Sequence, residues 1–270
     1  MSASSAYVEF AKRAFAREAT YRVQVFTRIG SVLLRVFLLG TLWTALYRNN
    51  GAKEGISLHA MITYATLALL LDLIYGVNGA YVIRQKIREG SIAIDFMRPI
   101  SVPLYVFADT LGQTGFALVQ IVPALLLSLP LLALIDARMG GPASLGAALA
   151  FVLSVALGFV LNFFIDLVMA TATFWTMEIF GIQIMVQFIS SLLSGSLVPL
   201  YFFPHVLQSF VFALPFAGLY NAPLSIYIGK WQGAEIAVGL AQQVFWVAVF
   251  WFGAIAFWRA AERRVVVQGG

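Results

Sequence analysis

The chain has 270 residues, of which 61% are hydrophobic and only 11% are charged, and its mean hydropathy is +0.90. Soluble domains carry about 25% charged residues, so this composition excludes a soluble enzyme, a disordered chain and an exposed nucleic-acid-binding protein. It predicts an all-α polytopic membrane protein, in which the net charge of +5 reflects positively charged loops on one side of a bilayer.

The N-terminal segment, residues 1–22, lacks the apolar stretch of a signal peptide and carries several charged side chains. Tyr7, Phe10 and Ala14 follow helical spacing, whereas Lys12 and Arg13 lie away from them. This pattern predicts a basic amphipathic helix that lies along the cytoplasmic membrane surface. The alternative is a solvated helical tail.

Six segments are apolar enough to cross the hydrocarbon core, which takes roughly 20 residues. They are expected at residues 23–47, 58–82, 103–135, 145–173, 179–199 and 234–258. The third and fourth exceed the minimum length, so they must tilt, kink or extend past the membrane.

The distribution of Lys and Arg indicates how these spans are oriented. Six spans place both ends of the chain on one side, and the basic residues concentrate in both terminal segments and in the loop after the second span. Because cytoplasmic loops carry the excess of Lys and Arg, both termini are expected in the cytoplasm. The basic residues on that side are Lys12, Arg13, Arg17, Arg22, Arg84, Lys86, Arg88, Arg98, Arg259, Arg263 and Arg264, against Arg48, Lys53, Arg138 and Lys230 on the other.

Several charged residues fall within the predicted spans, where a charge is costly unless it is paired or functional. Arg35 and Asp72 both come near mid-depth of neighbouring antiparallel helices, so an ion pair between them is feasible. Arg28, Asp109 and Asp166 fall toward the inner half and could form a second cluster. Ion pairing that holds the bundle together is favoured over a proton or substrate relay, because basic and acidic residues occur together.

The segment 83–103 is the longest polar stretch between spans on the cytoplasmic side. Its charged residues are interleaved with apolar ones, and Gly90 and Pro99 interrupt it. A short helix that exposes apolar residues to the cytoplasm indicates a docking surface for another protein. The alternative is a positive loop that lies on anionic lipid.

The segment 199–231 is mostly apolar, yet it is punctuated by proline. A continuous spanning helix does not tolerate so many interruptions. We therefore expect two short re-entrant helices in the outer leaflet, at about residues 204–213 and 216–227, with an apolar extracellular loop packed on protein as the alternative. The prolines are Pro199, Pro204, Pro215 and Pro223.

Catalytic motifs are missing from the sequence. No phosphate-binding loop G-x-x-x-x-G-K-[ST] occurs, because Gly229-Lys230 is followed by Trp231. The histidines, His59 and His205, belong to no metal-binding motif, and the chain has no cysteine to serve as a nucleophile or a metal ligand. We therefore expect no nucleotide site, no metal site and no catalytic residue in this chain.

The order of these features resembles the membrane permease subunits of type-2 ABC exporters (the ABC-2 type) over the whole chain. The resemblance rests on Arg17-Glu18 and Tyr21-Arg22 in the N-terminal helix, and on the cytoplasmic run from Ile87-Arg88-Glu89-Gly90-Ser91-Ile92 to Phe96-Met97-Arg98-Pro99. It also rests on the late block that runs from Ser194-Gly195 and Leu197-Val198-Pro199 through Leu214-Pro215-Phe216 to Gly229.

The resemblance implies a single transmembrane domain in the inner (plasma) membrane, working beside a second permease subunit, identical or homologous, and a dimer of separate cytoplasmic ATPases. ATP and Mg²⁺ would be used by those ATPases, while this chain would bind no cofactor and would not be an enzyme. Members of the family export drugs, antibiotics, lipids or glycans. Segment 199–227 would cap the pathway outside, and segment 83–99 would be the coupling helix that docks on the ATPase, with contacts at Ile87, Arg88, Glu89, Ile92, Phe96 and Met97.

Two other hypotheses remain open from the sequence. A proton-coupled secondary transporter would use Asp72, Asp109 and Asp166, although the two halves of the chain show no convincing internal repeat. A membrane-embedded enzyme or assembly factor would need a nucleophile and base or a metal cluster, which the sequence does not offer.

Overall fold

The computed structural model of the chain describes residues 3–48, 54–77, 79–97, 100–176 and 180–268. Within these ranges every regular element is helical, as the composition predicts. Lys53, Arg98, Pro99 and Ile179, which entered the expectations above, lie outside the described residues.

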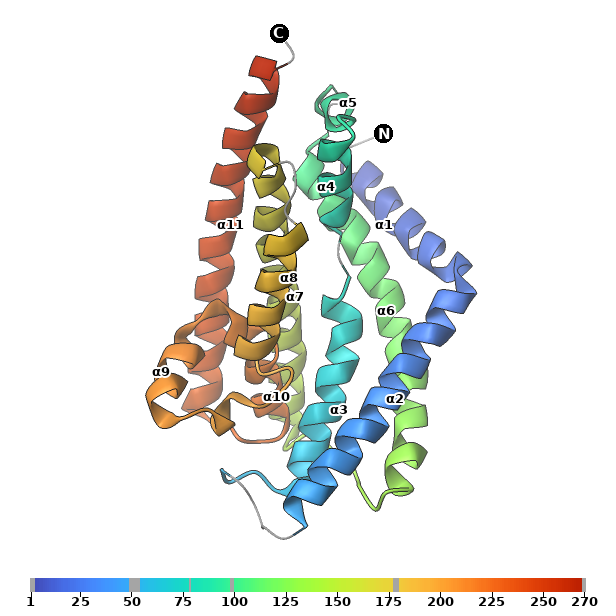
Figure 1. Cartoon of the computed structure of the whole chain (residues 1–270), viewed down its shortest axis with the longest axis vertical. Helices are drawn as coiled ribbons and strands as arrows, with labels where there is room; N and C mark the ends of the chain where they lie inside the picture. Colours follow the sequence, from blue (N-terminus) through green and yellow to red (C-terminus); the bar gives the residue numbers. More distant parts are fainter. Residues whose placement is uncertain (1–2, 49–53, 78, 98–99, 177–179, 269–270) are drawn as a thin grey trace.

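Five helices in the described part of the chain are long and apolar enough to cross a membrane. They are α2 (Arg22–Tyr47), α3 (Leu58–Tyr75), α6 (Val102–Ala133), α7 (Leu145–Thr176) and α11 (Ala234–Gln268). They form one elongated bundle (Figure 1), which confirms an all-α polytopic membrane protein. At about 1.5 Å per residue, α6, α7 and α11 are all longer than the roughly 30 Å hydrocarbon core.

The second span is shorter than predicted, because α3 ends at Tyr75 instead of continuing to residue 82. Gly76 caps the helix, and Gly79 passes so close to the Thr110 side chain of α6 that no Cβ would fit there. The chain then begins a separate helix, α4 (Tyr81–Arg88), which packs against α7. The sequence did not show this break, because the residues around it carry no charge.

The predicted fifth span is also shorter, so the six-span count is not confirmed. Helix α8 (Phe180–Leu193) has 14 residues, which reach only about 21 Å. It ends before Gly195, whose φ of +84° favours glycine, and the Tyr64 hydroxyl of α3 donates a hydrogen bond to the Gly195 carbonyl at 2.9 Å. The described chain therefore has five candidate spans and one short apolar helix.

Helix α3 lies at the centre of the bundle. Its residues 61–71 are all buried, because α2, α6, α7 and α10 pack around it. The main apolar core gathers there and includes Val36 of α2, Leu132 of α6 and Leu161 of α7. A second core lies beneath α4, where Ile83 packs with side chains of α6, α7 and α11.

The N-terminal helix, α1 (Ala3–Thr20), packs along α6 (Figure 1). The Phe10 ring meets Tyr105 edge-on with centroids 4.7 Å apart, and Ala14 is fully buried. The apolar face that the sequence assigned to the membrane surface is therefore covered at least in part by α6. The position of this helix at a membrane surface stays a prediction.

The proline-rich segment before α11 is broken into short helices, and it lies toward the end of the bundle opposite the termini (Figure 1). The helix expected at 204–213 is present, but the one expected at 216–227 is divided, because the Asn221 N–H turns to the Ser194 carbonyl at 2.9 Å. The short helices are η1 (Leu200–Phe202), α9 (His205–Ala213), η2 (Pro215–Gly218) and α10 (Asn221–Tyr227). Prolines lie in the first turn of each or directly before it: Pro199, Pro204, Pro215 and Pro223.

Candidate functional site

Arg35 of α2, Asp72 of α3 and Tyr220, which precedes α10, form a partly exposed polar cluster between the helices of the bundle. Arg35 Nη1 lies 2.9 Å from Asp72 Oδ2, and the Tyr220 hydroxyl donates to the other carboxylate oxygen at 2.6 Å. The structure thus brings together Arg35 and Asp72, for which the sequence indicates an ion pair, and it adds Tyr220. Both carboxylate oxygens have a partner, which is how a charge is tolerated within a membrane protein.

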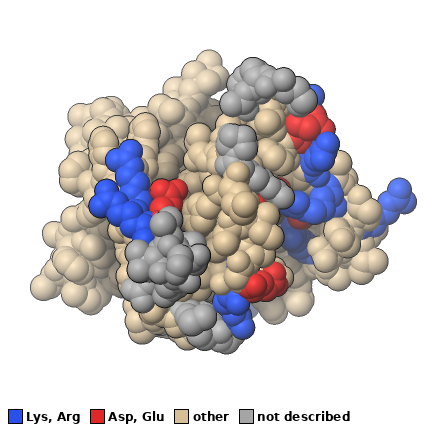
Figure 2. Space-filling view, turned by 90° about the horizontal axis from the view of Figure 1, so that it is seen from above, with Lys and Arg blue, Asp and Glu red and all other residues tan. Residues whose placement is uncertain are grey.

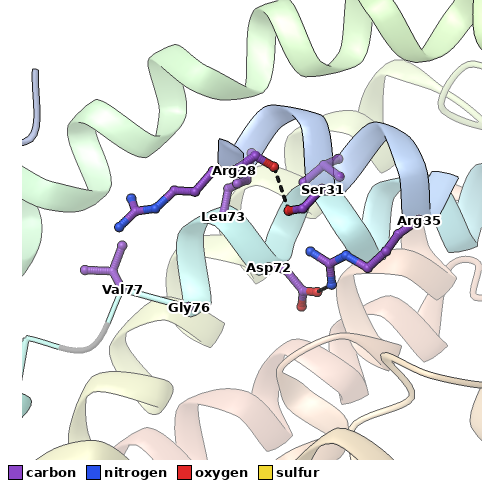
Figure 3. A pocket seen from close by; sticks show the side chains of 8 residues that line it. Arg28, Ser31, Arg35, Asp72, Leu73, Gly76 and Val77 are labelled. Atoms are coloured by element: carbon purple, nitrogen blue, oxygen red, sulfur yellow. Dashed lines mark hydrogen bonds and ion pairs between the residues drawn. The ribbon is translucent and has the colours of Figure 1, made fainter. Parts of the chain in front are cut away.

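The second charge cluster considered from the sequence is not formed. Arg28 Nη1 lies 3.4 Å from a carboxylate oxygen of Glu18, and its side chain points away from Asp72 (Figure 3). Asp109 pairs with Arg17 at 2.9 Å. The reason is that α1 packs against the bundle and supplies both partners, which the sequence had placed on the membrane surface.

A cavity of about 590 Å³ opens beside the Arg35–Asp72 pair, and residues of α3, α7 and α8 line it. A second cavity, of about 110 Å³, adjoins it and reaches α4. We call the two cavities together the polar trough, because hydroxyl and amide side chains of α7 and α8 line both. The lining residues that the two cavities share are Tyr75, Gly76, Asn162, Gln187, Ser190 and Leu219.

Helix α8 contributes a polar face to this trough. Gln183, Gln187, Ser190 and Ser194 recur at helical spacing, so they share one side of the helix and its extension. Sequence reasoning missed this face. The helical period of polar residues within an otherwise apolar segment was the signal that could have revealed it.

Arg84 of α4 lines the smaller cavity and is only 7% exposed. Its Nε and Nη2 atoms make no hydrogen bond to any described residue, and its guanidinium lies 5.5 Å from the centre of the Tyr81 ring. Burial lowers the pKa of this guanidinium from its usual value, and the charge of Asp166 on α7 acts in the opposite direction.

Asp166 completes this end of the polar trough. It is partly buried, lines the same cavity as Arg84, and accepts a hydrogen bond from the Asn162 amide at 3.3 Å. No ion pair within 4.0 Å joins Asp166 to Arg84 in the described structure. The trough therefore holds a buried cation and a carboxyl that do not pair directly with each other.

The segment expected to dock on an ATPase forms α4 and the short helix α5 (Ile92–Phe96), with a turn between them. Three of its six candidate contacts face the interior: Ile92 is buried, and Ile87 and Phe96 pack against the second core. The Phe96 ring lies 6.0 Å from the Trp258 ring of α11. The three exposed candidates are Arg88, Glu89 and Met97.

Two apolar side chains project from α5 and the residue after it. Ile94 is 57% exposed and Met97 is 85% exposed, and we call this pair the α5 tip. An ion pair of 2.5 Å between Lys86 and Asp95 holds α5 against α4. The α5 tip lies at the end of the bundle where both termini are found (Figure 1), and the view onto this end shows Lys and Arg at several places, with Asp and Glu beside them (Figure 2).

The bundle of long apolar helices, with the polar trough along its side, defines an integral membrane protein of the polytopic α-helical class. The family model described as ABC-2 family transporter protein matches residues 33–269, and the chain belongs to this family. Comparison with curated proteins gives no match. Proteins of the family are membrane transport components that are not themselves catalytic and that typically work with an ATPase partner.

Proposed function

We propose that the chain is the transmembrane permease subunit of an ATP-driven exporter, in which two permease subunits form the pathway and a cytoplasmic ATPase dimer supplies the energy. Membership of the ABC-2 family supports the transport role. The observation that carries the proposal is the α5 tip, because exposed apolar side chains on a short, well-anchored helix are suited to a protein partner. ATP and Mg²⁺ bind to that partner.

The polar trough supports the proposal that a second permease subunit packs against this one. Gln187 and Ser191 line it on α8, and Gln187 is exposed along the side of the bundle. Polar side chains that face acyl chains are costly in a bilayer. A second subunit placed across the trough would cover them and would enclose a pathway between the two copies.

The packing behind the α5 tip provides a route for coupling. Ile87 and Phe96 connect α4 and α5 to the core formed with α7 and α11. When ATP closes the ATPase dimer, a movement of α4–α5 is passed to these long helices. ATP shifts the permease pair between two arrangements only because its contact energies differ in the two states.

The proposal is tested by co-purifying the chain with ABC-type ATPases encoded beside it. We expect Met97→Asp to lower the affinity for the ATPase about tenfold, because it places a charge in an apolar contact worth about 1.4 kcal/mol. Leu134→Asp is the matched control, since Leu134 is similarly exposed, at 79%, but lies at the opposite end of α6. Phe96 is unsuitable for this test because its loss would disturb the interior packing.

If no cytoplasmic ATPase associates with the chain, or if Met97→Asp and Leu134→Asp behave alike, the proposal is wrong. Transport that stops when the proton gradient is dissipated while ATP is intact would instead indicate the proton-coupled alternative. Of the three carboxyl groups that this alternative would use, Asp72 and Asp109 are ion-paired, whereas Asp166 forms no ion pair within 4.0 Å in the described part of the chain.

A further inference from the structure

Arg84 lines the smaller cavity of the polar trough and carries buried hydrogen-bond donors that have no acceptor among the described residues. Its side chain is more than nine-tenths buried, and its Nε and Nη2 atoms find no partner among the described residues. An unpaired buried donor is costly, and more so when it is charged. A guanidinium kept in such a place is suited to a ligand that brings the acceptor.

Asp166 limits what that ligand can be. It lines the same small cavity as Arg84, and Asn162 supplies it with one hydrogen bond. A simple anion would be attracted by Arg84 and repelled by the Asp166 carboxylate. A group that combines an anionic oxygen with a hydrogen-bond donor satisfies both side chains.

The larger cavity adds an apolar wall to this polar end. Ile184, Phe188 and Leu197 line it, and Phe188 is 63% exposed. Arg35 and Asp72 also line it, but they already form an ion pair with each other, so they leave no comparable charge without a partner. The trough thus has an unsatisfied charged end and an apolar side, which is the pattern that an amphipathic molecule requires.

We propose that the polar trough binds an amphipathic molecule whose headgroup carries both an anionic oxygen group and an N–H donor, with the anionic group on Arg84, the N–H donor on Asp166 and the apolar part along α8. This assignment rests on the proposed function, and it names the class of substrate for the same pathway. Arginine suits the anionic group because its planar fork can donate two parallel hydrogen bonds to phosphate or carboxylate.

The proposal is tested with the purified full chain in a neutral maltoside detergent, by titration with oleoyl lysophosphatidylethanolamine. This probe carries a phosphate and an ammonium group. Monooleoylglycerol has the same acyl chain without either charge, and oleoyl lysophosphatidylcholine keeps the phosphate but has no N–H donor. We expect the ethanolamine lipid to bind at least about tenfold more tightly than monooleoylglycerol, and more tightly than the choline lipid.

Two variants and one control test whether the preference for the ethanolamine lipid arises in the polar trough. Arg84→Gln should remove the preference for the ethanolamine lipid over monooleoylglycerol. Gln187→Leu changes an exposed lining residue, so it should fold, and it should weaken binding of the ethanolamine lipid by several-fold. Arg138→Gln removes an equal charge from an exposed position outside the trough and should leave both affinities unchanged.

Several results would overturn the proposal. Equal binding of the ethanolamine lipid and monooleoylglycerol by the unaltered chain would exclude an anionic headgroup, and equal binding of the ethanolamine and choline lipids would exclude the role of Asp166. Competition by inorganic phosphate at the same concentration would indicate a small-anion site instead of a lipid site. If Arg84→Gln does not fold, an unchanged affinity in Gln187→Leu would exclude the trough.

The result of this lipid-binding test can be told apart from the result of the test of the proposed function. A chain that binds an ATPase through the α5 tip but does not discriminate between the headgroups would retain its role as a permease and lose this substrate class. A chain that discriminates between headgroups but never associates with an ATPase would keep the binding site and lose the ATP-driven mechanism.

Discussion

At the scale of single residues, the Arg35–Asp72 pair connects segments that are distant in the sequence. Arg35 comes from α2 and Asp72 from α3, while Tyr220 adds the segment before α10 through its hydroxyl. The pair lies at the edge of a cavity, so it is neither fully buried nor freely solvated. Its contribution should therefore be smaller than that of an ion pair in a dry core.

Removal of Arg35 should lower the stability of the protein, because it takes away the partner of the Asp72 charge. In Arg35→Ala, Asp72 keeps only its hydrogen bond from Tyr220, so the free energy of unfolding should fall by about 2 kcal/mol, below the range seen when fully buried pairs are broken. SDS-induced unfolding in mixed micelles measures this change.

The double variant Arg35→Ala/Asp72→Asn is the control for that measurement. It removes the unpaired charge but keeps an acceptor for the Tyr220 hydroxyl, so it should recover part of the lost stability. Equal losses in the single and the double variant would contradict a stabilising role for the pair.

At the scale of elements, the crossing of α1 and α6 makes α1 part of the bundle. A Cβ at Gly112 would collide with the backbone carbonyl oxygen of Ala11 and would lie 2.8 Å from the Ala14 Cβ. Close approach of two helices at a small residue is a common packing mode in membranes. The Arg17–Asp109 ion pair lies next to this crossing and holds the same two helices.

Gly112→Ala should separate α1 from α6. The backbone of Ala11 cannot move aside cheaply, so we expect a loss of about 2 kcal/mol in the free energy of unfolding and faster amide hydrogen exchange in α1. Gly115→Ala, one turn further along α6, is the matched control: its Cβ would meet only Phe15 Cδ2 at 3.6 Å. That variant should stay within about 0.5 kcal/mol of the unaltered chain, and equal effects of the two substitutions would disprove the tight crossing.

At the scale of the whole molecule, the ends of the bundle differ. The N-terminus, the C-terminus and the α4–α5 segment share one end, while the end of α2, the start of α3 and the connection from α6 to α7 lie at the other (Figure 1). Because the excess of Lys and Arg marks the cytoplasmic side, the end with the termini is expected to face the cytoplasm.

Cysteine labelling can test this orientation without background, since the chain contains no cysteine. Single variants Met97→Cys and Arg138→Cys place exposed thiols at the two ends. In intact cells that lack the ATPase, a membrane-impermeant maleimide should label Arg138→Cys, and it should label Met97→Cys only after permeabilisation. The reverse pattern would contradict the expected topology and, with it, cytoplasmic docking at the α5 tip.

Much of the architecture follows from local features of the sequence. Hydrophobic length placed the spans at α2, α6 and α7 within a few residues of their boundaries, and it placed the start of α11, which continues to Gln268 instead of ending at residue 258. Proline positions located the short helices after α8. The ends of α3 and α8 could not be predicted in this way. Helix α3 ends just before the chain packs Gly79 against Thr110 of α6, and α8 ends before Gly195, whose carbonyl accepts a hydrogen bond from the Tyr64 hydroxyl of α3. Such partners are known only after folding.

The sequence by itself determined that this is a helical membrane protein, that prolines break the apolar segment before the last span into short helices, and where Lys and Arg concentrate along the chain, because these properties depend on composition and short-range spacing. Only the tertiary structure decided that Arg28 and Asp109 pair with α1, that Ile92 and Phe96 face inward, and that Arg84 meets Asp166 across a cavity. Contacts of that kind depend on which helices pack together, and the apolar surfaces of membrane helices carry little information about their partners.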